Sequence, residues 1–121
     1  PHAGFSAVEP WLPIPEDHVR RAVSGQNGDA DSVLTVAREL MELRRSSPLL
    51  RYGAFRSLEL EPPLLGFDRV RDDGLIRCIF NLGKAAVSCD APREGRILFS
   101  TGAVDQQAGR LGPLAACILE P

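Results

Sequence analysis

The stretch 29–48, DADSVLTVARELMELRRSSP, most constrains the fold of this 121-residue chain. Its apolar residues recur at the spacing of one face of an α-helix, and charged residues fill the other face. Asp29 is the expected N-cap, because its carboxylate can accept a hydrogen bond from a free N–H of the first turn. Pro48 is the expected end, because proline has no N–H to donate. The apolar positions are Val33, Val36, Ala37, Leu40, Met41 and Leu43.

The pattern after residue 50 changes to short apolar runs separated by turn residues, which is typical of strands. A hairpin turn is expected at Asp72-Asp73-Gly74, and the Gly-rich residues 101–112 are expected to form a loop. The sequence therefore predicts a mainly β protein, with one N-terminal helix followed by an antiparallel β-sandwich or open barrel. About six strands are expected, at 54–60, 64–71, 75–82, 85–89, 96–100 and 114–120.

A second turn is expected at Gly83-Lys84. If the two residues form a hairpin, Leu82 pairs with Ala85, and counting outward sets Cys78 opposite Cys89. We therefore expect two neighbouring reduced thiols on adjacent strands.

The first 28 residues are rich in proline and glycine, which predicts an extended, irregular leader with one helical turn near 17–23. Its charged residues supply no recognisable catalytic pattern. Glu9, Glu16 and Asp17 are expected to be solvated loop carboxylates. His2 and His18 have no nucleophile at a recognisable spacing. We expect no catalytic residue in this chain.

Composition excludes several other functions. The net charge of −2 gives no reason to expect nucleic acid or an anionic membrane surface as a partner. No apolar run approaches the roughly 20 residues of a membrane span. The three cysteines lack CxxC spacing, so neither a zinc site nor a disulfide framework is expected. Reduced thiols favour a cytoplasmic protein.

Two further motifs are also excluded as ligand sites. Asp72-Asp73-Gly74 lacks the alternating oxygen ligands of a calcium loop. Residues 102–112 lack the spacing of a phosphate-binding loop. No metal or cofactor is expected.

Three stretches resemble the C-terminal end of α-glucosidases in the α-amylase clan of glycoside hydrolases, in the oligo-1,6-glucosidase-like branch. The first is AGFS at 3–6 with PWLP at 10–13, which is similar to the family's loop after the eighth barrel strand. The second is Gln26 with DADSVL, LRR and PLL through Tyr52-Gly53. The third is Phe80-Asn81-Leu82, which is similar to the central strand of the family's C-terminal β-domain.

The resemblance implies that residues 1–50 are the last barrel loop and the eighth barrel helix, and that 51–121 are the C-terminal antiparallel β-domain. The parent enzyme would be a retaining glycosidase whose carboxylates lie before this segment, so the segment alone would be inactive. Phe5 and Trp11 would then border the α-glucoside substrate, or serve as apolar plugs that tie the loop to the barrel.

Two functions remain open. One is the C-terminal part of a retaining α-glucosidase, with the β-domain as a structural support. The alternative is a free-standing β-sandwich module that binds glycan or protein. Because the eighth helix would lack barrel strands to pack on, the isolated chain is expected to form a homodimer through the helix and leader. The alternative is that the leader folds back over the helix.

Overall fold

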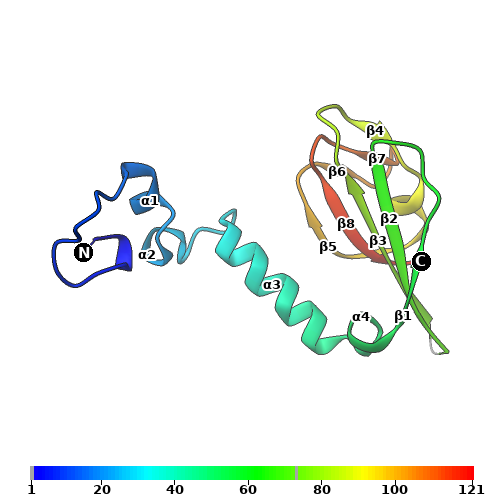
Figure 1. The fold of residues 1–121 in the computed structure, drawn as a ribbon. Helices are drawn as coiled ribbons and strands as arrows, with labels where there is room; N and C mark the ends of the chain where they lie inside the picture. The colour runs from blue at the N-terminus through cyan, green and yellow to red at the C-terminus, as the bar shows by residue number, and fades with distance from the viewer. Residues whose placement is uncertain (1, 73) are drawn as a thin grey trace. The chain divides into compact units, whose positions relative to one another are not determined.

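The computed structural model describes residues 2–72 and 74–121, and the chain divides into two compact units, Pro1–Glu42 and Leu43–Pro121. Figure 1 shows the helices α1, α2 and most of α3 in the first unit, and α4 with the strands in the second. The mainly β prediction is confirmed, because α3 (Val33–Ser46) is the single described helix of seven or more residues and all described strands pair antiparallel. None of the described helices combines the length and apolar character that a membrane crossing requires.

The first unit contains three short helical elements before α3. They are η1 (His2–Gly4), α1 (Glu16–Arg20) and α2 (Val23–Gln26). The helical turn expected near 17–23 is thus divided between two helices, and Ala22 between them is buried. Pro15 precedes α1 with an extended ψ of 147°, and its fixed φ suits the entry to a helix.

The cap of α3 differs from the prediction. The hydroxyl of Ser32, rather than the carboxylate of Asp29, accepts a hydrogen bond from the Thr35 N–H, at 3.2 Å. The side-chain oxygen of Gln26 accepts a second one from the Leu34 N–H, at 3.0 Å. Asp29 instead accepts from the N–H two residues further on, at 3.0 Å. This local turn competes with the helix, which therefore begins later than expected.

Pro48 also has a role that the sequence did not suggest. Helix α3 ends at Ser46, and a second helix, α4 (Pro48–Tyr52), follows at once. The hydroxyl of Ser47 caps α4 by accepting a hydrogen bond from the Leu50 N–H at 3.2 Å. Proline suits the first helical turn, because an N–H there has no helical acceptor. The same residue therefore ends one helix and begins the next.

Two antiparallel sheets make up the second unit, with strand orders β1-β2-β3-β8-β5 and β4-β7-β6. In Figure 1 the C-terminal strand β8, in red, lies between β3 and β5. The eight described strands are β1 (Ala54–Ser57), β2 (Leu64–Arg71), β3 (Gly74–Asn81), β4 (Val87–Ser88), β5 (Arg96–Thr101), β6 (Val104–Asp105), β7 (Arg110–Leu111) and β8 (Ala116–Glu120).

The hairpin between β2 and β3 is confirmed, since Arg71 pairs with Gly74. Asp72 lies in a turn, and the expected turn residue Asp73 lies outside the described residues. The loop expected over 101–112 is wrong in part, because it contains β6 and β7. These two-residue strands are too short to show any periodicity in the sequence.

The five-stranded sheet has an apolar core on each face. Ile79 of β3 belongs to one core, together with Leu111 from the three-stranded sheet. Ile76 and Cys78 of β3 belong to the other core, together with Leu50 from α4. Successive side chains of a strand point to opposite faces, so Cys78 and Ile79 enter different cores. The long sheet is therefore covered by a second sheet on one face and by a short helix on the other.

Asn81, at the end of β3, is a buried polar residue that joins distant parts of the second unit. Only 1% of it is exposed. Its side-chain NH₂ donates to the carbonyl oxygens of Ala85, Leu111 and Gly112 at 2.8, 3.2 and 2.7 Å. Its side-chain oxygen accepts from the Gly83 N–H at 2.9 Å. The amide thus uses both its donors and its acceptor, as a buried amide must.

The register that set Cys78 opposite Cys89 is wrong. Cys78 pairs with Phe67 on β2, whereas Cys89 follows β4, which belongs to the other sheet. The chain leaves the long sheet after Asn81 instead of turning back at Gly83-Lys84. The groups that a tight hairpin would pair have other partners: the Leu82 N–H donates to the Pro63 carbonyl at 3.0 Å, and the Ala85 carbonyl accepts from the Asn81 side chain at 2.8 Å.

An ion triad around the buried Asp68 crosses the middle of β2 and β3 in the long sheet. Asp68 of β2 is directly opposite Arg56 of β1 and Arg77 of β3. Arg77 donates to the Asp68 carboxylate from Nε at 2.8 Å and from Nη2 at 3.1 Å, and Arg56 donates from Nη2 at 2.7 Å. The hydrogen bonds from Arg77 hold the pKa of the Asp68 carboxyl below its usual range, with Arg56 adding to the effect against the opposing effect of burial.

Candidate functional site

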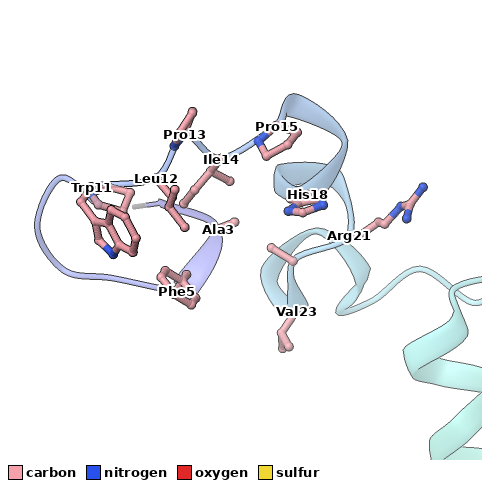
Figure 2. Close-up of a pocket in the computed structure, with 12 residues that line it drawn as sticks. Ala3, Phe5, Trp11, Leu12, Pro13, Ile14, Pro15, His18, Arg21 and Val23 are labelled. Carbon is pink, nitrogen blue, oxygen red and sulfur yellow. The ribbon is translucent and has the colours of Figure 1, made fainter.

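A pocket of about 550 Å³ lies within the first unit, between the leader and the helices α1 and α2. Figure 2 shows the leader loop on one side and the two short helices on the other. The larger side chains that line the pocket are Phe5, Trp11, Leu12, Ile14, His18 and Arg21. The other lining residues are alanines, prolines and a valine.

Phe5 and Trp11, which the sequence singled out, both line this pocket. Phe5 is 82% exposed and Trp11 is 90% exposed. Neither ring therefore packs as a plug inside the first unit, whereas Ile14 is half-buried. A contiguous group of exposed apolar side chains marks a site that meets a ligand or another surface. The structure brings the two candidates together at one pocket, and their role in substrate contact stays a prediction.

The shape of the pocket follows from its prolines. Pro10, Pro13 and Pro15 all contribute to the lining, and each fixes its own φ and restricts the residue before it. Nδ1 of His2 lies 3.8 Å from a carboxylate oxygen of Glu9, which brings the two ends of the first loop together. The proline-rich residues 10–15 are thus held in a stiff path outside the described strands.

The polar groups near the pocket are few. His18, on α1, directs its ring toward the leader in Figure 2. Arg21 directs its guanidinium away from Phe5 and Trp11, and its Nη2 lies 3.3 Å from the Asp17 carboxylate. The pocket therefore presents mainly hydrocarbon and aromatic surface, and its polar side-chain groups come from His18, Arg21 and the Trp11 indole.

The carboxylates considered from the sequence do not line this pocket. Glu9 lies beside His2 and Asp17 beside Arg21, and Glu16 begins α1. Such an arrangement can bind an apolar group but offers no paired carboxylates for acid–base chemistry. Among the described residues, no group of three or more His, Cys, Asp or Glu side chains could hold a metal ion.

The three cysteines of the second unit are free and buried. Burial raises the pKa of the Cys78 and Cys117 thiols to about 11, and it also raises the pKa of Cys89. A raised pKa leaves little of the thiolate, which is the form that reacts or binds metal. These residues therefore behave as small apolar side chains of the two cores.

The sequence did not indicate that Leu12, Ile14 and the helical residue His18 would line one pocket with the aromatic pair. The signal present was the alternation of prolines with apolar residues at 10–15, which indicates a stiff segment but not where it folds. Asn81 and Asp68 were also missed as structural centres. An asparagine or aspartate inside an apolar strand is a usable signal, because a buried polar group needs partners.

Comparison with known proteins gives related sequences but no family model that matches. The chain is 38% identical over 92 residues to a probable α-glucosidase of Rhizobium meliloti (strain 1021), covering 76% of this chain and 17% of that protein. It is 36% identical over 61 residues to an α-glucosidase of Candida albicans, covering 50% of this chain and 11% of that protein. The chain thus spans less than a fifth of these curated relatives.

Solved structures share the fold. An isomaltulose synthase from Klebsiella sp. LX3 matches with a TM-score of 0.81 and 22% identity, over 97% of this chain and 22% of that chain. The trehalulose synthase MutB from Pseudomonas mesoacidophila MX-45 matches with a TM-score of 0.84 and 22% identity, over 98% of this chain and 23% of that chain. At this level of identity the likeness shows the fold alone.

Proposed function

The chain belongs to the α-amylase-clan glycoside hydrolases, among their α-glucosidase-like members, and from this premise we propose that it is the C-terminal part of a retaining α-glucosidase acting on α-glucosidic oligosaccharides. The observation that carries the proposal is the 38% identity over 92 residues to a probable α-glucosidase. Residues 1–50 supply the last barrel loop and the eighth barrel helix. Residues 51–121 form a β-domain that supports the barrel.

The catalytic carboxylates belong to other parts of the parent enzyme in this proposal. A retaining glycosidase needs a nucleophile and a general acid/base whose carboxyl groups are about 5 Å apart. The 121-residue chain alone should therefore release no p-nitrophenol from p-nitrophenyl α-glucoside. Turnover that survives removal of contaminating hydrolases would contradict this part of the proposal.

The parent protein provides the direct test. Its open reading frame upstream of residue 1 should encode the three carboxylate motifs, and its product should hydrolyse p-nitrophenyl α-glucoside. Proton NMR of the early reaction should show the α-anomer of glucose first, because two displacements retain configuration. The appearance of β-glucose first, or a reading frame without the carboxylates, would refute the proposal.

The second candidate is a free-standing β-sandwich module that binds glycan or protein. It predicts that residues 51–121 occur without barrel motifs upstream. It also predicts saturable binding of oligosaccharide or protein by the chain itself. Aromatic residues make up only 6% of the chain, which disfavours a broad sugar-stacking surface. The same upstream sequence therefore separates the two candidates.

Phe5 and Trp11 border the substrate in this proposal, since loops at the catalytic face of such barrels build the pocket. The alternative is that both rings brace the loop against the barrel. The proposed enzyme is cytoplasmic, requires no cofactor or metal, and has no nucleic-acid partner. The lack of CxxC spacing supports the proposal that no zinc site is present. The net charge of −2 supports the proposal that nucleic acid is not a partner.

Self-association of the isolated chain is a further part of the proposal. Helix α3 buries none of its residues fully, and Val33 and Met41 are 79% and 61% exposed. Full burial of such a side chain is worth roughly 1.5–3 kcal/mol, so a two-fold dimer through the helix and leader is favourable. Sedimentation equilibrium at micromolar concentration should show the dimer, and Leu40→Glu should dissociate it. A monomer of 13.1 kDa would instead support a leader that folds back over the helix.

A further inference from the structure

One face of the five-stranded sheet carries a row of three phenylalanine rings, here called the aromatic row. The rings belong to Phe55 of β1, Phe67 of β2 and Phe80 of β3, with centroids 5.1 Å apart for the first pair and 6.0 Å apart for the second. Phe67 and Phe80 pack against the same core as Leu50 of α4. Phe55 remains 63% exposed and Leu65 of β2 remains 50% exposed. Helix α4 therefore covers only part of this face, and a contiguous apolar surface of this kind marks an interface.

Arg69 of β2 lies on the same face without a polar partner. In the register of the sheet it is directly opposite Phe55 on one side and the buried Ile76 on the other, and directly opposed residues share a face. Its Nε is buried and makes no hydrogen bond. Within the described residues, the guanidinium of Arg69 has no ion-pair partner either. Glu120, which strand alternation places on this face, is already paired with Arg96.

The position of Arg69 restricts what can cover the aromatic row. The side chain is half-buried, so the outer part of its guanidinium keeps contact with water. A surface that covers the row removes this water, and a buried guanidinium without a partner is strongly unfavourable. A carboxylate removes the penalty, because the fork of N–H groups on a guanidinium matches its two oxygens. The covering surface must therefore be apolar around one carboxylate.

The end of helix α3 indicates which surface this is. Leu43, in the last turn of α3, packs against the same core as Leu50 and Phe67. In the proposed function α3 is the eighth helix of a barrel, so the polypeptide that contains the barrel is tethered beside this face. The matched residues are only 17% of the related probable α-glucosidase, so most of such a protein lies outside them. A tethered surface has a high effective concentration, which favours it over a separate molecule.

We propose that Arg69 forms an ion pair with a carboxylate that the preceding part of the parent enzyme brings onto the aromatic row. The inference rests on the proposed α-glucosidase function and adds to it a specific polar contact between the β-domain and the rest of the enzyme. Apolar burial is not directional, whereas a charged pair fixes register across an interface. Arg69 is thus a positioning residue that sets how the β-domain is seated.

The parent protein and the 121-residue chain give a direct comparison, because only the parent contains the proposed partner. Both are treated with phenylglyoxal, which modifies arginine side chains, and each site is quantified by mass spectrometry. Arg69 should react at least about tenfold more slowly in the parent, since the reagent reaches a buried interface only when it opens. Arg56 of the neighbouring strand is the matched control. Its partner Asp68 lies within the chain, so its rate should be similar in both proteins.

Charge reversal tests for the carboxylate. In the parent, Arg69→Glu should lower the thermal unfolding midpoint by at least about 2 °C more than Arg69→Gln, because it places two carboxylates together. In the isolated chain the two variants should unfold within about 1 °C of each other, as expected for an exposed position without a partner. The same two substitutions at Arg56 should differ in both proteins, because Asp68 is present in both.

Each outcome decides for or against the ion pair. Equal reactivity of Arg69 in the parent and in the isolated chain would overturn it, and so would equal midpoints for the two Arg69 variants of the parent. Protection of Arg69 in the isolated chain that increases with protein concentration would assign the face to a second copy and would also overturn it. A parent that hydrolyses p-nitrophenyl α-glucoside with retention but leaves Arg69 reactive would keep the proposed function and refute this inference. A parent without that activity would refute the proposed function, whatever the reactivity of Arg69.

Discussion

Replacement of Asp68 by asparagine tests whether the buried ion triad stabilises the β-domain through charge. Asparagine has nearly the same volume, so the substitution opens no cavity. It keeps one acceptor oxygen but turns an NH₂ group toward the guanidinium groups. Asp68 is fully buried, whereas Arg77 is 24% exposed and Arg56 is 58% exposed. The arginines can therefore recover part of their solvation when the carboxylate is lost.

The magnitude follows from these contacts. Breaking a buried ion pair costs about 3–5 kcal/mol when the remaining charge stays buried, and exposed pairs contribute about 0–1 kcal/mol. Because Arg77 is partly exposed, we expect Asp68→Asn to lower the free energy of unfolding by about 3 kcal/mol. Arg56→Gln, at the exposed side of the triad, should cost less than about 1 kcal/mol.

The loss is measured by urea unfolding followed by far-ultraviolet circular dichroism, which reports on the strands. Tryptophan fluorescence would not report on them, because Trp11 lies in the other unit. With a slope of about 1.5 kcal/mol per molar urea, the midpoint should fall by about 2 M.

The pH dependence distinguishes charge from packing. The folded-state pKa of Asp68 is lowered, and the unfolded value is about 3.9. Its contribution to stability is therefore fully present above the unfolded pKa, and it disappears as the pH falls through the lower folded pKa. The difference between wild type and Asp68→Asn should be constant from about pH 8 to about pH 5 and should vanish at strongly acidic pH. A difference of the same size at acidic pH would refute the charge argument.

Three further predictions concern the same framework. Asn81→Asp should lower the free energy of unfolding by about 3 kcal/mol or more, because it removes the NH₂ group that donates to three backbone carbonyls. Leu82→Ser, at the exposed neighbouring residue, should change it little in the same urea titration. In the native chain the thiols of Cys78 and Cys117, with pKa values of about 11, should react with a disulfide reagent near neutral pH far more slowly than after unfolding in urea, and equal rates would contradict their burial. Ser32→Ala should reduce the helical circular dichroism signal and lower stability by about 1 kcal/mol, whereas Asp29→Ala should have the smaller effect, because the hydroxyl of Ser32 makes the cap contact with Thr35.

The local structure was largely determined by the sequence itself. The periodicity of 33–46 predicts α3, because a helix repeats every 3.6 residues and the apolar positions follow that repeat. The strands β2, β3, β5 and β8 lie close to the expected ranges, since each is long enough to show a pattern. The resemblance to α-glucosidases could also be read from the sequence, because it rests on contiguous stretches such as PWLP and DADSVL.

Tertiary structure alone decided the pairing of the strands after β3. The turn at Gly83-Lys84 is locally favourable, yet the chain does not turn back there. Asn81 bonds Gly112 and Leu111, about 30 residues further along the chain, and no local propensity encodes a contact at that distance. β6 and β7 have the same origin, because two-residue strands exist only where a partner strand is already in place.

The caps and the pocket were decided in the same way. Asp29 and Ser32 are both good capping residues, and in the fold the Ser32 hydroxyl also donates to the Gln26 carbonyl of α2, at 3.0 Å. Phe5 and Trp11 were visible in the sequence, but their meeting with Ile14 and His18 at one pocket required the path of the leader. The physical reason is common to these cases: sequence patterns report which groups need partners, and only the fold brings a particular partner within reach.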